Sequence, residues 1–354
     1  MTDMIIRIAV DAMGGDNVPG VLVEGSAAAV RKYSDVWVTL VGNESKVNDY
    51  IDKLRGRENP GKSRAADEKT DWSRIRVVHS EEVIDMNDAP ARAIRTKKDA
   101  SIVVANKLCR SGEVDAVISA GNTGAAMAAS LLFMGRLQGV SRPAIMTLFP
   151  SMKGVVAVLD LGANTDCKPE HLYQFAIMAS IFVSHIVGNK NPRVGLLSIG
   201  EERSKGNELT IGAYDLLEKS ELNFIGNIEG RDIFQGTADI IVCDGFVGNV
   251  LLKFGESIFG FITYSVRKNI MKSIWRKMGA YLLKPVFKEI KAEMSPEEYG
   301  GAPLLGVDGI SIICHGNSSD IAIMNAIRVA RRLVVEKVND LIKSELANKN
   351  LGKK

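Results

Sequence analysis

The sequence predicts an α/β protein with a three-layer α/β/α arrangement and a mostly parallel sheet. Short runs rich in Val, Ile and Leu recur between amphipathic stretches. Several runs are apolar at consecutive positions, which is typical of strands covered by helices on both faces. The predicted strands are Ile5–Val10, Val36–Val41, Ile75–His79, Val114–Ser119, Val155–Asp160, Val194–Ser198, Ile240–Asp244 and Ile310–Cys314. We expect them to belong to one large α/β unit over residues 1–348.

Composition and charge exclude several classes of protein. The chain has 354 residues, of which 46% are hydrophobic and 25% charged, so its apolar content is that of a folded protein. A net charge of +3 is too balanced for a surface built to bind nucleic acid, and we expect no such partner. The four cysteines form no C-x-x-C pair and the four histidines have no metal-ligand spacing. We therefore expect no metal, no cofactor and no disulfide framework.

The N-terminal region enters an apolar strand pattern directly and lacks the pattern of a secretory leader. The longest nearly uncharged helical stretch, Phe175–Val187, is shorter than the roughly 20 residues that span a bilayer. We therefore expect a cytoplasmic protein.

Five of the predicted strands are followed by loops that combine glycine with Asp, Asn, Glu or Thr. These loops are Asp11–Asn17, Ser119–Ala125, Asp160–Asp166, Ile199–Arg203 and Asp244–Asn249. Turn and capping chemistry explains any one of them. Ligands in parallel sheets bind beyond the carboxyl ends of the strands. Five similar loops, which we expect at one edge of the sheet, therefore favour a site for a polar ligand.

The loop Ser119–Ala125 has the pattern of an anion site. Gly121 and Gly124 allow the backbone to approach a ligand, and the amides at the start of the following helix would point at a phosphate. Asn122 and Thr123 add side-chain donors. An ordinary helix start packed by small residues explains this loop equally well. No G-x-G-x-x-G sequence follows a strand, which weighs against a dinucleotide site.

The segment Gly56–Ser63 matches the G-x-x-x-x-G-K-[ST] phosphate loop, but its context is wrong. A true phosphate loop leaves a buried strand and opens a helix. This one follows the helical pattern of Glu44–Leu54 and precedes charged residues without an apolar stripe. We interpret residues 56–72 as a charged surface insertion.

Residues 261–294, called the arm below, are predicted to form a protruding basic amphipathic helix interrupted at Pro285. Positions 261–291 hold eight basic residues and one acidic residue, a net charge of +7 that leaves −4 for the rest of the chain. A helical period places the following residues on one apolar face: Ile270, Met271, Ile274, Trp275, Met278, Tyr281 and Leu282. Such a helix is typical of membrane-surface or partner docking, and packing on its own domain or on a second subunit is the alternative. The expected contact residues are Lys268, Lys272, Ile274, Trp275, Arg276 and Met278.

Six motifs in order resemble the bacterial phosphate acyltransferases of phospholipid synthesis. They are Asp11–Asp16, Ser119–Ala125, Leu159–Asn164, Asn191–Glu202, Val242–Val250 and Gly301–Gly306. The resemblance implies a fold akin to the isocitrate dehydrogenase and phosphotransacetylase group. It also implies transfer of a long-chain fatty acyl group from acyl carrier protein to inorganic phosphate. A homodimer loosely associated with the membrane is implied too, with a membrane glycerol-3-phosphate acyltransferase using the acyl phosphate for phosphatidic acid synthesis.

This activity requires a site that holds phosphate against the thioester carbonyl and stabilises a tetrahedral oxyanion. We expect phosphate on Gly121, Asn122, Thr123 and Gly124, with Asn164 and either Lys205 or Arg203 completing the clamp. We expect Asp11, Asp16 and Asp244 to orient these groups, so that the catalytic set is Asn122, Asn164, Lys205, Asp11, Asp16 and Asp244. The alternatives are a nicotinamide-dependent dehydrogenase of related fold and a non-catalytic lipid-binding protein.

Overall fold

A computed structural model describes residues 4–57, 69–293 and 296–351. Its strands are β1 (Ile6–Asp11), β2 (Val36–Gly42), β3 (Ile75–His79), β4 (Ala116–Ser119), β5 (Ala144–Ser151), β6 (Gly154–Leu159), β7 (Val194–Leu197), β8 (Phe224–Ile228), β9 (Ile240–Val242), β10 (Ala302–Leu305) and β11 (Ile310–Ile313). Its α-helices are α1 (Gly20–Lys32), α2 (Glu44–Arg57), α3 (Pro90–Thr96), α4 (Ser101–Arg110), α5 (Thr123–Ala129), α6 (Pro169–Phe182), α7 (Glu208–Glu218), α8 (Asp232–Gln235), α9 (Gly245–Ile270), α10 (Ile274–Leu282), α11 (Lys284–Glu293), α12 (Asp320–Val335) and α13 (Val338–Leu351). Single 3₁₀ or π turns are η2 (Trp72–Arg74), η3 (Ser130–Met134), η4 (Val183–Val187) and η5 (Pro296–Tyr299). All eight predicted strands are confirmed within a residue or two at each end.

Three strands were missed by the sequence analysis, and each carries a residue that weakens a strand pattern. β5 contains Pro150, β10 contains Pro303, and β8 contains Gly226 in a left-handed conformation with φ of 96°. Proline cannot donate to a ladder hydrogen bond, and glycine has no side chain to pack. The sheet tolerates all three for different reasons. Pro150 lies near the end of β5, where only β6 and not β10 pairs with the strand. Pro303 lies in a strand of four residues, and Gly226 lies beside the register shift between Val194 and Gly195.

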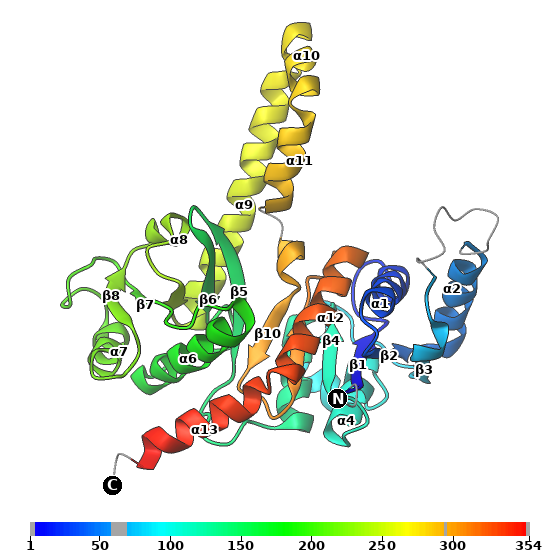
Figure 1. Ribbon diagram of the computed structural model, residues 1–354, viewed down its shortest axis with the longest axis horizontal. Helices are drawn as coiled ribbons and strands as arrows, with labels where there is room; N and C mark the ends of the chain where they lie inside the picture. Colours follow the sequence, from blue (N-terminus) through cyan, green and yellow to red (C-terminus); the bar gives the residue numbers. More distant parts are fainter. Residues whose placement is uncertain (1–3, 58–68, 294–295, 352–354) are drawn as a thin grey trace.

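Helices cover both faces of the sheet, which confirms the three-layer prediction (Figure 1). Alternate residues of β1 enter two separate clusters: Ile8 and Val10 pack with one, and Ala9 with the other. The first cluster contains buried side chains of α1, α2, α6, α7, α12 and α13, and the second those of α3, α4, α5 and α8. The strands are therefore apolar on both sides, which is why their sequence runs do not alternate.

The sheet has eleven strands in the order β3-β2-β1-β4-β11-β10-β5-β6-β9-β7-β8. Most neighbouring pairs are parallel, but β11–β10, β10–β5 and β5–β6 are antiparallel. Three reversals make β6, β7, β8 and β9 run opposite to β1, β2, β3, β4 and β11. The expectation that five polar loops share one sheet edge is therefore wrong. β5 and β10, which cause the reversal, are two of the missed strands.

The twist common to β-sheets turns the two halves of this sheet relative to each other. Neighbouring strands rotate by roughly 20 to 25° each, so the four steps from β4 to β6 accumulate to a turn on the order of 90°. The loops after β1 and β4 form one group, and the loops after β6, β7 and β9 form another.

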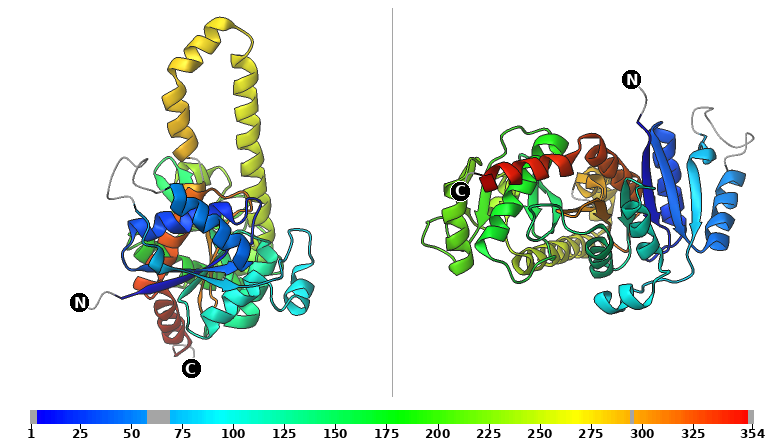
Figure 2. Two further views of the ribbon diagram at one scale, coloured as in Figure 1. Left: turned by 90° about the vertical axis from the view of Figure 1, so that its right-hand side faces the viewer. Right: turned by 90° about the horizontal axis from the view of Figure 1, so that it is seen from below.

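The arm rises from the body as two antiparallel limbs (Figures 1 and 2). α9 begins inside the body at Gly245 and runs outward, and α10 and α11 return. The prediction of one continuous apolar face from Ile270 to Leu282 is wrong, because α9 ends at Ile270 and a separate helix, α10, begins at Ile274. α11 begins next to Pro285, a residue favoured in the first turn of a helix.

α9 is long and apolar enough to cross a membrane by length and composition alone. It is therefore a longer apolar helix than Phe175–Val187, which is divided between α6 and η4. Most of the suspected insertion at 56–72 lies outside the described residues. The helix expected before it is confirmed as α2.

Candidate active site

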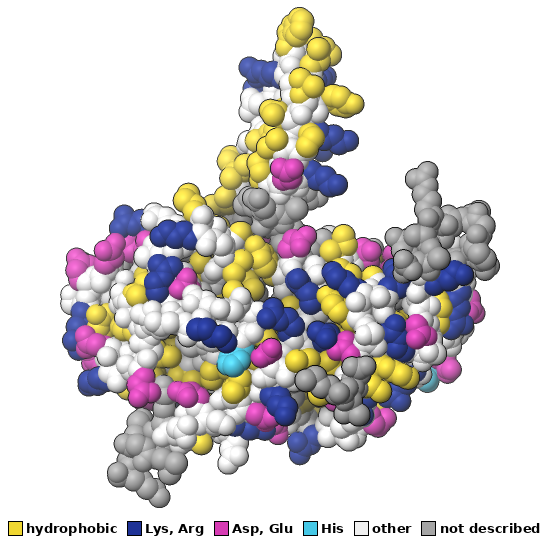
Figure 3. Space-filling view, in the orientation of Figure 1, with side chains coloured by type: hydrophobic (Ala, Val, Ile, Leu, Met, Phe, Trp, Pro, Cys, Tyr) yellow, Lys and Arg dark blue, Asp and Glu magenta, His cyan; other side chains and the backbone are white. Residues whose placement is uncertain are grey.

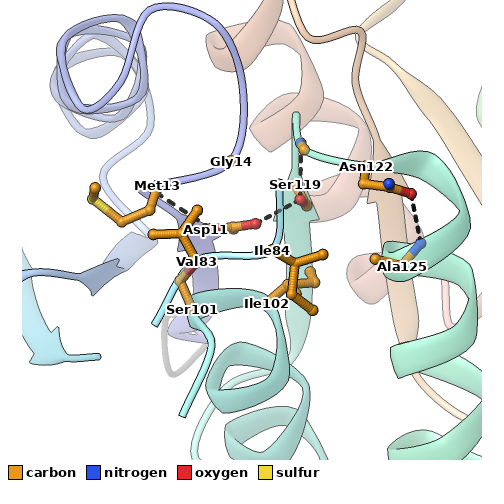
Figure 4. Close-up of a pocket in the computed structure, with 11 residues that line it drawn as sticks. Asp11, Met13, Gly14, Val83, Ile84, Ser101, Ile102, Ser119, Asn122 and Ala125 are labelled. Atoms are coloured by element: carbon orange, nitrogen blue, oxygen red, sulfur yellow. Dashed lines mark hydrogen bonds between the residues drawn. The ribbon is translucent and has the colours of Figure 1, made fainter. Parts of the chain in front are cut away.

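A small pocket opens where β1 and β4 end, and a buried carboxylate lies at its floor (Figure 4). It is lined by Asp11, Met13, Gly14, Val83, Ile84, Ser101, Ile102, Ser119, Gly121, Asn122 and Ala125. Asp11 is 2% exposed, and its Oδ2 accepts a hydrogen bond from the Ser119 hydroxyl at 2.7 Å. Burial raises the pKa of the Asp11 carboxyl, against the opposing effect of hydrogen bonds from serine hydroxyls and main-chain amides.

Two glycines bring the loop after β1 against the loop after β4. A Cβ atom on Gly14 would lie 2.5 Å from Asp11 Oδ2 and 2.9 Å from the Gly121 nitrogen. Any side chain at position 14 would therefore push the two loops apart. Asp16, further along the first loop, is exposed, and its amide donates to the Gly316 carbonyl at 2.8 Å. The Gly-Gly pattern after β1 thus builds the pocket wall.

Asn122 has a structural role at the start of α5. Its Oδ1 accepts from the Ala125 amide at 3.0 Å, which caps the helix. Its Nδ2 donates to the Met86 carbonyl at 3.0 Å, which holds the loop before α3 over the pocket. The side-chain amide is therefore occupied at both ends, whereas the sequence analysis expected it to bind phosphate.

The remaining donors of this loop belong to the first turn of α5, in which Thr123 is exposed and Gly124 is partly buried. The Gly121 amide already donates to the Ser119 hydroxyl at 3.1 Å. The amides of Thr123 and Gly124 precede the first amide that can donate within the helix, so they are available to an anion. Thr123 is exposed and adds a hydroxyl. Of the four predicted phosphate residues, Thr123 and Gly124 are therefore the two whose donors are not used by the hydrogen bonds described above.

The loop after β6 is organised by Asp160, a residue that the sequence analysis did not select. This carboxylate is fully buried and accepts from the amides of Ile145, Ala163 and Asn164 at 3.0, 3.1 and 2.6 Å. It also accepts from Asn164 Nδ2 at 2.9 Å. Burial raises the pKa of Asp160, although these donors oppose the shift. The available signal was an aspartate directly behind an apolar strand, but the sequence does not show that four donors converge on it.

Asn164 links this loop to two others. Its Nδ2 also donates to the Pro143 carbonyl at 2.7 Å, so both hydrogens of the amide are used. Its main-chain carbonyl accepts from the Gly245 amide at 2.7 Å, at the start of α9. Asn164 therefore positions α9, and only its side-chain oxygen remains for a ligand.

The start of α9 is packed tightly against the same loop. Asp244 caps the helix by accepting from the amides of Phe246 and Val247 at 2.9 and 3.0 Å. A Cβ atom on Gly245 would lie 2.7 Å from the Asn164 carbonyl oxygen, and one on Gly248 would overlap the carbonyl oxygen of Asp160. The structure thus brings Asn164 and Asp244 together, as expected for two loops at neighbouring strand ends.

The loop after β7 holds two cations that behave differently. Arg203 forms ion pairs with Asp215 at 2.7 Å and Glu218 at 3.0 Å, so its charge is directed at α7. Lys205 is exposed, and within the described ranges no ion pair involves its ammonium group. Lys205 is therefore the better placed of the two candidates for holding an anion.

The candidate residues fall into two sets on oppositely running halves of the sheet. Asp11, Asp16 and the loop of Gly121–Gly124 belong to the first half, and Asn164, Lys205 and Asp244 to the second. In the part of the chain that the structure describes, no three His, Cys, Asp or Glu side chains gather as metal ligands. The available chemistry is hydrogen-bond donation and positive charge.

Comparison with solved structures finds the same architecture in two phosphotransacetylases. The enzyme from Streptococcus pyogenes has a TM-score of 0.59 at 16% identity, and the EutD phosphotransacetylase from Staphylococcus aureus has a TM-score of 0.57 at 15% identity. Each alignment covers 93% of this chain and 94% of the other. At such low identity the likeness shows the fold.

Comparison of sequences identifies the family. A phosphate acyltransferase of Desulfitobacterium hafniense is 49% identical over 96% of this chain and 98% of its own. One from Pelotomaculum thermopropionicum is 48% identical over 96% and 95%. The model of the family described as "Fatty acid synthesis protein" matches residues 6–341. The chain therefore belongs to this family, and it is an acyltransferase of lipid synthesis related to the phosphate acyltransferases.

Proposed function

We propose that this protein transfers a long-chain fatty acyl group from acyl carrier protein to inorganic phosphate, giving acyl phosphate and free carrier protein. The observation that carries this proposal is the near-complete alignment with phosphate acyltransferases at 49% identity. The polar loops at the strand ends support it, because amides and positively charged side chains stabilise the oxyanion of a tetrahedral intermediate.

Phosphate binds at the first turn of α5, held by the amides of Thr123 and Gly124 and by the Thr123 hydroxyl. Gly121 shapes the approach, and Asn122 fixes the turn through its cap. Lys205, from the other half of the sheet, supplies a positive charge. Asp11 and Ser119 hold the loops in place from below, and Arg203 stabilises the Lys205 loop through α7.

The reaction is a direct acyl transfer. A phosphate oxygen attacks the thioester carbon, the carbonyl oxygen becomes a tetrahedral oxyanion, and the C–S bond breaks as the intermediate collapses. The carrier thiolate leaves with the bonding electron pair, so a strong general acid is unnecessary. The chain contributes positioning and charge stabilisation, which can supply most of the barrier reduction in such reactions.

The arm is the contact for carrier protein and for the membrane surface. Its exposed apolar side chains include Ile274, Trp275 and Met278, which are 64%, 76% and 55% exposed. Lys268, Lys272 and Arg276 add positive charge that suits an acidic carrier or anionic lipid. In this proposal the protein acts as a cytoplasmic homodimer at the membrane, where a glycerol-3-phosphate acyltransferase consumes the acyl phosphate.

Purified protein mixed with palmitoyl carrier protein tests the proposal. We expect release of free carrier thiol that depends on added phosphate, and the apparent affinity for the carrier should fall as salt is raised. Thiol release that does not depend on phosphate would contradict the proposed activity. Carrier affinity that ignores ionic strength would contradict docking on the basic arm.

A further inference from the structure

We propose that Asn227, near the end of β8, is a positioning residue that holds Lys205 where its ammonium group reaches phosphate, an inference that rests on the proposed function. The sequence analysis did not select Asn227. Its side chain is 6% exposed, and its Nδ2 donates to the main-chain carbonyl of Glu202 at 2.9 Å. Glu202 lies in the loop after β7 (residues 199–206), called the Lys205 loop below. A buried side chain of one strand thus holds the loop that follows the neighbouring strand.

Two hydrogen bonds converge on the Glu202 carbonyl, and they fix the main chain of Lys205. The second donor to this oxygen is the Lys205 amide, also at 2.9 Å. The Lys205 carbonyl accepts in turn from the Ser198 hydroxyl at 3.1 Å. The Ser198 amide donates to the Ile228 carbonyl at 2.8 Å. Both main-chain polar groups of Lys205 are therefore tied to the end of β8, one through Glu202 and the other through Ser198.

Charged side chains also link the Lys205 loop to its surroundings, but they lie on the surface. In the part of the chain that the structure describes, these links join Arg203 to Asp215, Glu218 and the Tyr214 ring, and Glu201 to Arg231. Basic and acidic side chains accordingly lie next to each other over β8 and α7 in the space-filling view (Figure 3). Exposed ion pairs contribute little, because water screens them and ordering long side chains costs entropy. The buried anchor of the loop is therefore Asn227.

The Asn227 amide has a partner at only one of its two ends. Among the described residues, its Oδ1 has no hydrogen-bond partner, although this atom is buried. A buried polar atom without a partner lowers stability and so offsets the gain from the bond to Glu202. Leucine, which is similar in size, would remove the unpaired oxygen together with that bond, and the Glu202 carbonyl would keep the Lys205 amide as its donor. The effects of Asn227 on stability and on positioning can therefore be measured separately.

The test measures phosphate kinetics in variants of the full-length protein. We expect Asn227→Leu to raise the KM for phosphate about fivefold, the factor that corresponds to one ordinary hydrogen bond, and to leave the KM for palmitoyl carrier protein unchanged. The matched control is Asn223→Leu, just before β8, where Nδ2 donates to the Asn191 carbonyl at 3.2 Å. This control should change neither KM. If Asn227→Leu does not fold, the same measurements on Asn227→Ser, whose side chain is one bond shorter, decide.

A double-mutant cycle separates positioning from a general disturbance of the fold. If Asn227 acts through Lys205, Asn227→Leu should not raise the KM for phosphate further in a Lys205→Ala background, because the charge that it positions is absent. Multiplication of the two effects in the double variant would overturn the proposal. An unchanged KM for phosphate in Asn227→Leu, or an equal rise in the Asn223→Leu control, would overturn it as well.

A binding measurement provides a readout that does not depend on turnover. Titration calorimetry with inorganic phosphate should give a Kd about fivefold higher for Asn227→Leu than for the wild type, and the same Kd for the wild type and Asn223→Leu. Equal Kd values for the wild type and Asn227→Leu would refute the positioning role. If the wild type shows no phosphate-dependent thiol release but the Kd values differ as expected, the proposed function fails while the positioning role stands.

Discussion

Replacing Gly248 with alanine should show that the close packing of α9 against the Asp160 loop affects stability more than the higher helix propensity of alanine does. A Cβ atom at this position would overlap the carbonyl oxygen of Asp160 and lie 3.0 Å from its carbon and 3.1 Å from the Cys243 sulfur. Asp160 accepts four hydrogen bonds through its carboxylate, so its backbone cannot shift without breaking them. The added methyl must therefore displace the start of α9.

The size of the effect follows from two opposing terms. Overpacking against a fixed backbone lowers the free energy of unfolding by about 3 kcal/mol. Alanine in place of glycine inside a helix raises it by about 1 kcal/mol. We expect Gly248→Ala to lower the free energy of unfolding by about 2 kcal/mol. Gly255→Ala, in the same helix with no heavy atom within 4 Å, should raise it by about 1 kcal/mol.

Urea denaturation followed by far-ultraviolet circular dichroism measures the stability of both variants. The Gly248→Ala midpoint should fall and the Gly255→Ala midpoint should rise, and only Gly248→Ala should lose phosphate-dependent thiol release. If the two variants are equally stable and equally active, the reasoning that ties α9 to the Asp160 loop is refuted.

Three further predictions concern buried and exposed charges. Asp160→Asn places an amide against four donors and should lower the free energy of unfolding by about 3 kcal/mol in urea denaturation; an unchanged midpoint would contradict the network. Because burial raises the pKa of Asp11 above its unfolded value near 4, the folded state binds more protons between the two values. The free energy of unfolding of the wild type, relative to Asp11→Asn, should therefore fall as the pH rises through that interval, and a rise would refute the assignment. Lys205→Ala should raise the KM for phosphate about tenfold or more, whereas Arg203→Ala, which removes exposed ion pairs and a contact with the Tyr214 ring on α7, should change it little; steady-state kinetics with equal effects would contradict the distinction.

The sequence was sufficient for the layers and for the polar strand ends, because those features are local. Consecutive apolar residues in β1 and β4 require cover on both faces, and glycine close to Asp, Asn or Glu marks each loop. The direction of the strands in the second half of the sheet could not be predicted from such local patterns. It depends on β5 and β10, where Pro150 and Pro303 interrupt the strand pattern and where pairing rather than propensity determines structure.

The roles of individual site residues were harder to predict than their positions. Asn122 and Asn164 are at strand ends as expected, but their side-chain amides are bonded to main-chain groups 36 and 21 residues away. Arg203 is paired with residues of α7 that follow it by 12 and 15 positions. Such contacts are set by tertiary packing, and residue type alone does not reveal them. Asp160 was overlooked for the same reason.

The central claim is that phosphate itself attacks the acyl thioester. Its most direct test is to incubate the protein with palmitoyl carrier protein and labelled inorganic phosphate and to measure free carrier thiol and labelled acyl phosphate together. The account predicts that both products appear in equal amounts and that neither forms when phosphate is omitted. Release of carrier thiol without formation of acyl phosphate, or no release at all, would contradict it.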